Sequence, residues 1–110
     1  MNFGTYQTEA VQTANKGGER AMRLCNWSMG LAGETGELVD LLKKHVHHGH
    51  ELDVLKVKKE LGDVLWYLAM LCEELNLSLD EVAQMNIEKL RARYPSGFST
   101  EASVKREPED

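Results

Sequence analysis

Four carboxylates stand in two pairs with helical spacing in the middle of the chain. Glu34 and Glu37 are three residues apart, and Glu60 and Asp63 repeat this spacing after the segment 38–59. Residues three apart on an α-helix share one face, so each pair aims two carboxylates in one direction. Such a cluster repels itself unless a hard divalent cation takes the oxygens as ligands. An all-oxygen set favours Mg²⁺, with Mn²⁺ as a substitute, while the spacing alone also fits a solvated acidic helix face.

The helix that carries the first pair is rich in glycine. Gly30, Gly33 and Gly36 fall within the sequence GLAGETGELVD, and each costs a helix about 1 kcal/mol relative to alanine. We expect that another helix or a ligand approaches closely there. Glu34 also occupies a position in an apolar seam with steps of three and four, formed by Leu24, Trp27, Leu31, Glu34, Leu38, Leu41 and His45. Burying a charge in such a seam is costly unless the charge is paired or binds a metal.

Helical spacing dominates the whole sequence, and no alternating strand pattern is present, so the predicted fold class is all-α. We expect an antiparallel bundle of about four helices in which a second apolar seam follows Val57, Leu61, Val64, Leu68, Leu71 and Leu75. Ser78 and Glu81 fit a capping box. The expected helices cover residues 4–15, 19–45, 52–76 and 79–93, with residues 47–50 as a connector.

The expected domain organisation is one helical domain over residues 1–95, followed by a polar, loosely ordered tail over residues 96–110. With 110 residues and 42% hydrophobic residues, long apolar helices would leave faces exposed on one subunit. We therefore expect a homo-oligomer, either a homodimer or a homotetramer.

The composition also bears on partners and location. The net charge of −5 argues against binding of long nucleic acids. Cys25 and Cys72 are widely spaced, as expected for reduced thiols. No apolar run reaches the roughly 20 residues needed to span a bilayer, and the first residues lack a secretory pattern. We expect a cytoplasmic protein without membrane contacts.

Taken in order, Glu34-x-x-Glu37, Glu60-x-x-Asp63 and the segments GLAGETGELVDLLKK, KKELGDVLWYLAML and NIEKLRARYPSGF resemble the small, single-domain MazG-like all-α nucleoside triphosphate pyrophosphohydrolases. The resemblance implies hydrolysis of an NTP or dNTP to the monophosphate and pyrophosphate, for nucleotide-pool sanitation. It assigns the four acids as catalytic metal ligands for Mg²⁺, with either Glu34 or Glu37 orienting the attacking water. It also implies obligate self-association.

The fourth expected helix places Asn86, Lys89 and Arg93 on one face. The resemblance implies that Asn86 and Lys89, and with them Arg93, bind the substrate or its phosphates; without it, they read as solvated charges and a polar core residue. Trp27 is a candidate for stacking on the nucleobase or for the core. Two further functional alternatives stay open: a related enzyme specific for dUTP, dCTP or phosphoribosyl-ATP, and a non-catalytic helical interaction protein.

A cluster of histidines follows the glycine-rich helix and invites a zinc interpretation. A structural zinc site needs four well-placed ligands, and neither cysteine is near in sequence. A polar loop is the alternative that the sequence favours for His45, His47, His48 and His50.

Overall fold

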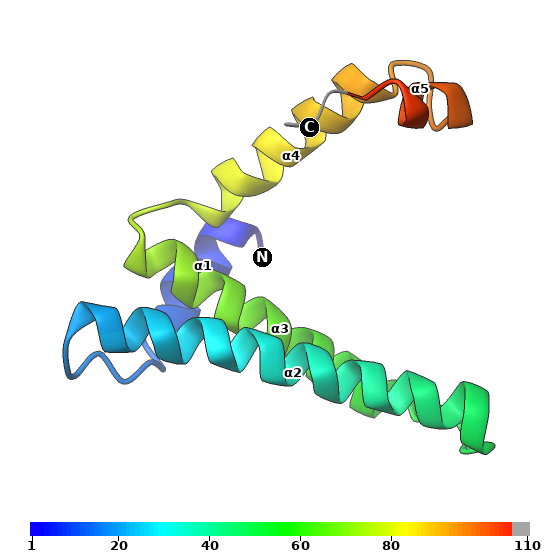
Figure 1. The fold of residues 1–110 in the computed structure, drawn as a ribbon. Coiled ribbons are helices and arrows are strands. Elements are labelled where there is room, and N and C mark those ends of the chain that lie inside the picture. The colour runs from blue at the N-terminus through cyan, green and yellow to red at the C-terminus, as the bar shows by residue number, and fades with distance from the viewer. Residues whose placement is uncertain (107–110) are drawn as a thin grey trace.

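The computed structural model describes residues 1–106, which form an all-helical chain (Figure 1). The all-α prediction is confirmed, and the helix bounds differ from the expected ones by a few residues. One further short helix lies in the C-terminal segment. The helices are α1 (Phe3–Val11), α2 (Arg20–His48), α3 (Val54–Glu74), α4 (Leu79–Arg93) and α5 (Thr100–Val104).

Polar caps set most of these bounds. The Asn2 side chain accepts a hydrogen bond from the Thr5 amide (2.8 Å), and the Asp53 side chain accepts one from the Lys56 amide (3.2 Å), which satisfies free amides at the starts of α1 and α3. Ser78 caps α4 by accepting a hydrogen bond from the Glu81 amide, as predicted. Gly49, with a φ of 73°, ends α2.

The end of α2 lies later than expected. His47 and His48, which were predicted to be in a connector, belong to the last turn of α2. After α2 begins, the first residue in the left-handed conformation, which glycine adopts without a steric cost, is Gly49.

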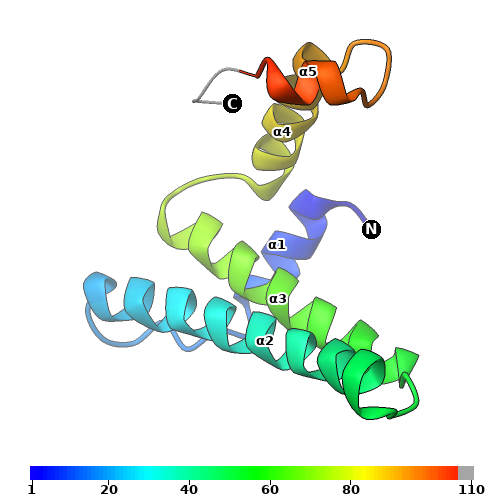
Figure 2. The ribbon, with the colours of Figure 1, turned by 45° about the vertical axis from the view of Figure 1, so that its right-hand side comes forward.

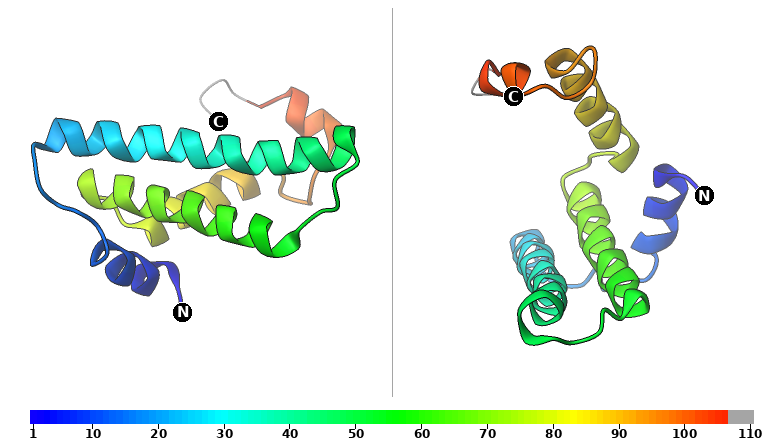
Figure 3. Two further views of the ribbon diagram at one scale, coloured as in Figure 1. Left: turned by 90° about the horizontal axis from the view of Figure 1, so that it is seen from below. Right: turned by 90° about the vertical axis from the view of Figure 1, so that its right-hand side faces the viewer.

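The long helices α2 and α3 form an antiparallel hairpin, and α1 packs against α3 (Figures 1 and 3). The buried core lies where α1 crosses the hairpin, at the N-terminal end of α2 and the C-terminal end of α3. Its hydrophobic members are Ala10, Val11, Trp27, Ala69, Met70, Cys72 and Leu79.

The apolar seam predicted for α3 packs only partly within one chain. Three of its leucines, Leu61, Leu68 and Leu75, are 51%, 37% and 45% exposed. The buried side of α3 is instead formed by Ala69, Met70 and Cys72, because α1 and α2 pack there. A row of three leucines, spaced seven residues apart, stays uncovered in a single chain.

Helix α4 does not complete a four-helix bundle within one chain. Its start is tied to α1, since the Gly4 amide donates to Asp80 Oδ2 (3.0 Å) and the Leu79 amide donates to Gln7 Oε1 (2.8 Å). Beyond this start, α4 runs away from the α2–α3 hairpin (Figures 1 and 2). One chain therefore has three packed helices and an arm formed by α4 and α5.

The C-terminal segment holds more structure than its composition predicted. The Ser99 side chain accepts a hydrogen bond from the Ala102 amide (3.1 Å) and caps α5. The last residues of the expected tail, 107–110, lie outside the described residues. Within residues 1–106, no helix combines the length and apolar character needed to cross a bilayer.

Candidate functional site

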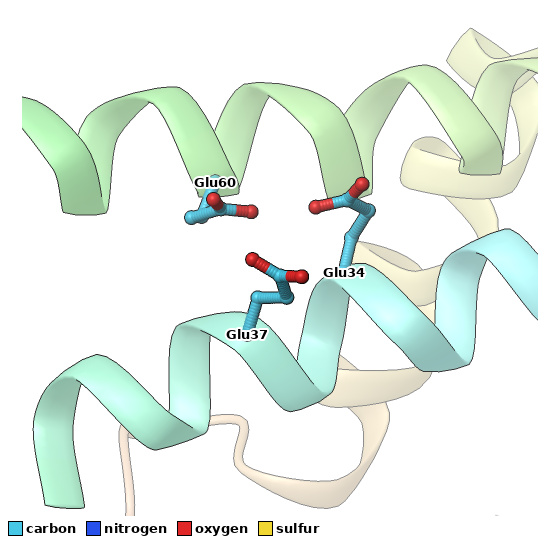
Figure 4. A group of neighbouring side chains, drawn as sticks. All are labelled: Glu34, Glu37 and Glu60. Atoms are coloured by element: carbon cyan, nitrogen blue, oxygen red, sulfur yellow. The ribbon is translucent and has the colours of Figure 1, made fainter.

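Three acidic side chains from the two long helices meet in the α2–α3 hairpin. Glu34 and Glu37 extend from α2 and Glu60 from α3, and one carboxylate oxygen of each lies within 4.8 Å of the other two (Figure 4). Glu34 and Glu60 are half-buried, whereas Glu37 is exposed. Asp63 is exposed and is not a member of this group, which we call the carboxylate cluster.

The carboxylates of the cluster repel one another, which disfavours the ionised form of Glu34. The pKa of Glu34 is raised from 4.5 to about 7. The largest cause is the Glu60 carboxylate, which can accept a hydrogen bond from protonated Glu34; burial comes next, followed by repulsion from Glu60, Asp63 and Glu37. Asp63 therefore lies near enough to act on Glu34 through its charge. Every charged group that contributes to this pKa shift is a carboxylate.

The donor set fits a hard divalent cation. Glu60 Oε2 is buried and has no hydrogen-bond partner among residues 1–106, and a buried carboxylate oxygen in this state is costly. Three carboxylates without nitrogen or sulfur ligands suit Mg²⁺ or Mn²⁺. A cation would satisfy the Glu60 oxygen and remove the repulsion that raises the pKa of Glu34.

At the other end of the hairpin, where the core lies, the carboxylate of Glu74 has partners of opposite charge or hydrogen-bond donors. Glu74 accepts hydrogen bonds from Arg23 Nε (2.7 Å) and Nη2 (3.2 Å) and from Trp27 Nε1 (3.3 Å). Arg23 is the first cause of the lowered pKa of Glu74. Trp27 is only 5% exposed, and its ring meets the edge of Trp66 at 5.5 Å. Of the two roles that the sequence left open for Trp27, this burial corresponds to the core.

The glycine prediction holds for one of the three glycines. A Cβ atom at Gly30 would collide with the ring of Tyr67 on α3, so the absence of a side chain lets the ring lie against α2. At Gly33 and Gly36, a Cβ atom would have no neighbour within 4 Å in the described chain. Only Gly30 is thus explained by packing within one chain.

The residues predicted on the fourth helix do not join the carboxylates within one chain. Asn86 and Lys89 are exposed, and Arg93 is half-buried, all on α4. This helix diverges from the hairpin that carries the cluster (Figure 2). Their role in substrate binding stays a prediction.

The histidines do not form a metal site with one another. His45 Nδ1 lies 2.8 Å from the backbone oxygen of His50. Among the residues that the structure describes, the carboxylate cluster is the one group of three or more possible metal ligands.

Sequence reasoning overlooked several lysines beside the cluster. A groove of about 750 Å³ includes Glu37 and Glu60 in its walls, and its other polar side chains include Lys44, Lys56 and Lys59. The signal that was available is the position of Lys56 in the first turn of α3, where positive charge is unfavourable.

The sequence pattern of the MazG nucleotide pyrophosphohydrolase domain matches residues 26–98, which include all four predicted acids. The chain belongs to this family. It is also 33% identical over 105 residues to the Gene 37 protein of Mycobacterium phage L5, a match that covers 88% of this chain and 92% of the relative. No solved structure matches the chain significantly.

Proposed function

We propose that this MazG-family protein is a Mg²⁺-dependent nucleoside triphosphate pyrophosphohydrolase. The observation that carries the proposal is the convergence of Glu34, Glu37 and Glu60 oxygens within 4.8 Å of one another. A triphosphate is a ligand that Mg²⁺ binds through phosphate oxygens while it keeps few protein ligands. The family membership supports the same reaction class.

The proposed reaction is attack of water on the α-phosphorus of an NTP or dNTP. The new bond joins the water oxygen to phosphorus, the bond to the oxygen that bridges the α- and β-phosphates breaks, and pyrophosphate leaves. Bound Mg²⁺ would lower the pKa of water and offset the charge of the leaving group. Mn²⁺ is the expected substitute.

We assign the chain's own residues to metal binding, water activation and substrate binding. Glu34, Glu37, Glu60 and Asp63 are the proposed ligands, and either Glu34 or Glu37 orients the water and accepts its proton. Phosphoryl transfer of this kind depends on positioning and charge neutralisation, so no covalent nucleophile is required. Asn86, Lys89 and Arg93 are the proposed substrate contacts from α4.

Self-association belongs to the same proposal. The exposed row of Leu61, Leu68 and Leu75 and the projecting α4 are surfaces that a second copy would cover. We propose a homodimer or homotetramer that acts in the cytoplasm on the free nucleotide pool.

The test is pyrophosphate release from a panel of NTPs and dNTPs, with and without Mg²⁺ or Mn²⁺. Release that depends on the metal supports the proposal, and a strong preference for dUTP, dCTP or phosphoribosyl-ATP would identify a specific member of the superfamily. No release from any substrate by the folded protein, with metal present, would reject the enzyme and favour a helical interaction protein.

A further inference from the structure

Two lysines of α3 lie beside the carboxylate cluster. On α3, Lys56 lies one helical turn before Glu60, and Lys59 directly precedes it. Both lysines line the groove of about 750 Å³ that also includes Glu37 and Glu60. Asp40 and Lys44 of α2 also line this groove, so three acids and three lysines share it.

Lys56 and Lys59 have no ion-pair partner in the part of the chain that the structure describes. Lys44, on the opposite wall, is paired with Asp40 at 2.8 Å. Within residues 1–106, neither Lys56 nor Lys59 forms an ion pair, and both are exposed. Their ammonium groups are therefore available to an anion that enters the groove.

The position of Lys56 in the first turn also works against the stability of α3. The first turn of α3 contains no acidic residue, and Lys56, Lys58 and Lys59 all lie near its N-terminus. Positive charge at this end opposes the helix dipole. Helix α4 has the favourable arrangement, with Asp80 and Glu81 in its first turn and Arg91 and Arg93 in its last.

The glycines on the opposite wall leave room for a ligand. Gly33 and Gly36 line the same groove, and a side chain added at either would have no neighbour within 4 Å. The groove thus has open space beside two positions of α2, and two of its three α3 side chains are lysines.

We propose that this groove binds the diphosphate end of the substrate, with Lys56 and Lys59 holding the β- and γ-phosphates next to the carboxylate cluster. This inference rests on the proposed function and deepens it, because it orients the triphosphate along the hairpin toward the loop at Gly49. It also places phosphate contacts on α3, in addition to those predicted on α4.

The test uses inorganic pyrophosphate as the probe and titration calorimetry on the full chain with Mg²⁺ present. Lys56→Gln and Lys59→Gln should each weaken pyrophosphate binding about 10-fold, the scale of one lost charge-assisted hydrogen bond. Lys58→Gln is the matched control: it removes the same charge from the same end of α3, but Lys58 does not line the groove. This control should bind within about 2-fold of the unmodified chain.

Folding is checked on the same samples. Removing positive charge from the start of α3 should leave the Tm unchanged or raise it slightly. Lys56→Arg and Lys59→Arg keep the charge and should retain binding, so a loss that appears only in the glutamine variants reports the lysine charge.

Three results would overturn the inference: no binding of pyrophosphate by the unmodified chain, unchanged binding by both Lys56→Gln and Lys59→Gln, or an equal loss in Lys58→Gln. Hydrolysis assays on the same proteins separate the two proposals. If hydrolysis depends on metal but pyrophosphate binding does not depend on the lysines, the phosphate-binding groove is rejected and the proposed enzyme activity stands. If pyrophosphate binding depends on the lysines but no nucleotide is hydrolysed, the phosphate-binding groove stands and the proposed enzyme activity is rejected.

Discussion

The two halves of the α2–α3 hairpin place acidic residues in opposite environments. In the half that contains the core, Glu74 is held by Arg23 and Trp27, and Arg23 is the first cause that lowers the pKa of its carboxyl. In the other half, Glu34 faces Glu60 and Glu37, and its pKa rises to about 7. The same pair of helices thus stabilises one carboxylate and destabilises another.

The opposite pKa shifts of Glu74 and Glu34 follow from the side chains that surround each carboxylate. Around Glu74, the opposite helix offers a guanidinium and an indole N–H. The ring of Tyr67, 6.4 Å from that of Trp27, fills the space left by Gly30. Around Glu34, the opposite helix offers another carboxylate, and the adjacent Gly33 leaves an open space. The acid of the core half is paired within one chain, whereas one chain places only other carboxylates around Glu34.

The largest expected effect is the loss of hydrolysis when one of the proposed metal ligands is neutralised. Glu37→Gln and Asp63→Asn should each lower turnover at least about 100-fold, because charge stabilisation in the transition state would be lost. Steady-state pyrophosphate release measures this. Glu74→Gln makes the same chemical change in the core half and should keep turnover within a few-fold of the unmodified protein. Near-normal rates in both Glu37→Gln and Asp63→Asn would reject the assignment of these acids as metal ligands.

The next effect concerns the contact between Gly30 and Tyr67. Gly30→Ala should lower the free energy of unfolding by about 1–3 kcal/mol, the usual cost of overpacking, because its Cβ atom would collide with the ring of Tyr67. Urea unfolding measures it.

A double-mutant cycle shows whether the ring is the cause. In a Tyr67→Ala background, Gly30→Ala should lose its penalty and act as an ordinary glycine replacement in a helix. If the two changes are additive, the collision is not the source of the instability.

The sequence predicted the helices and the acids better than it predicted their surroundings. The spacing of Glu34 and Glu37, and the position of Glu60 on the next helix, were enough to bring them together, because a short connector makes neighbouring helices antiparallel. The direction of α4 was not predictable from periodicity. It depends on tertiary contacts of its first residues, such as the hydrogen bond from the Leu79 amide to Gln7.

Burial was the least predictable property. Leu61 and Leu68 continue the helical spacing of α3, yet periodicity does not say which of several apolar stripes packs within the chain and which stays exposed. The position of Trp27 in the α2 seam fits both a core residue and a residue that stacks on the nucleobase. Only its neighbours, Glu74 and Trp66, distinguish the two.

The third prediction concerns stability as a function of pH without metal. The pKa of Glu34 is about 7 in the folded chain against 4.5 as its ordinary value, so the folded state binds more protons between these pH values. The free energy of unfolding should therefore fall as the pH rises from about 4.5 to about 7. Urea unfolding in a chelator at several pH values measures this fall, and Glu34→Gln should reduce it.

Glu74 supplies the control for this pH dependence. Its pKa is lowered in the folded chain, so its contribution is present above pH 4.5 and is lost as the pH falls through the folded value. Glu74→Gln should therefore leave the fall between pH 4.5 and 7 intact. Added Mg²⁺ should remove the fall in the unmodified chain, and a fall that persists in Glu34→Gln would contradict the cluster as its origin.

The smallest expected effect is on stability, at Gly33 beside the carboxylate cluster. Gly33→Ala should raise the free energy of unfolding by about 0.5–1 kcal/mol, because alanine suits a helix better and its Cβ atom would have no neighbour within 4 Å. The sign is therefore opposite to that at Gly30, one turn away on the same helix. If Gly33→Ala instead destabilises the protein, and does so more strongly at concentrations where chains associate, the space at Gly33 is filled by a second copy. The cluster half of the hairpin would then be completed by protein as well as by a cation.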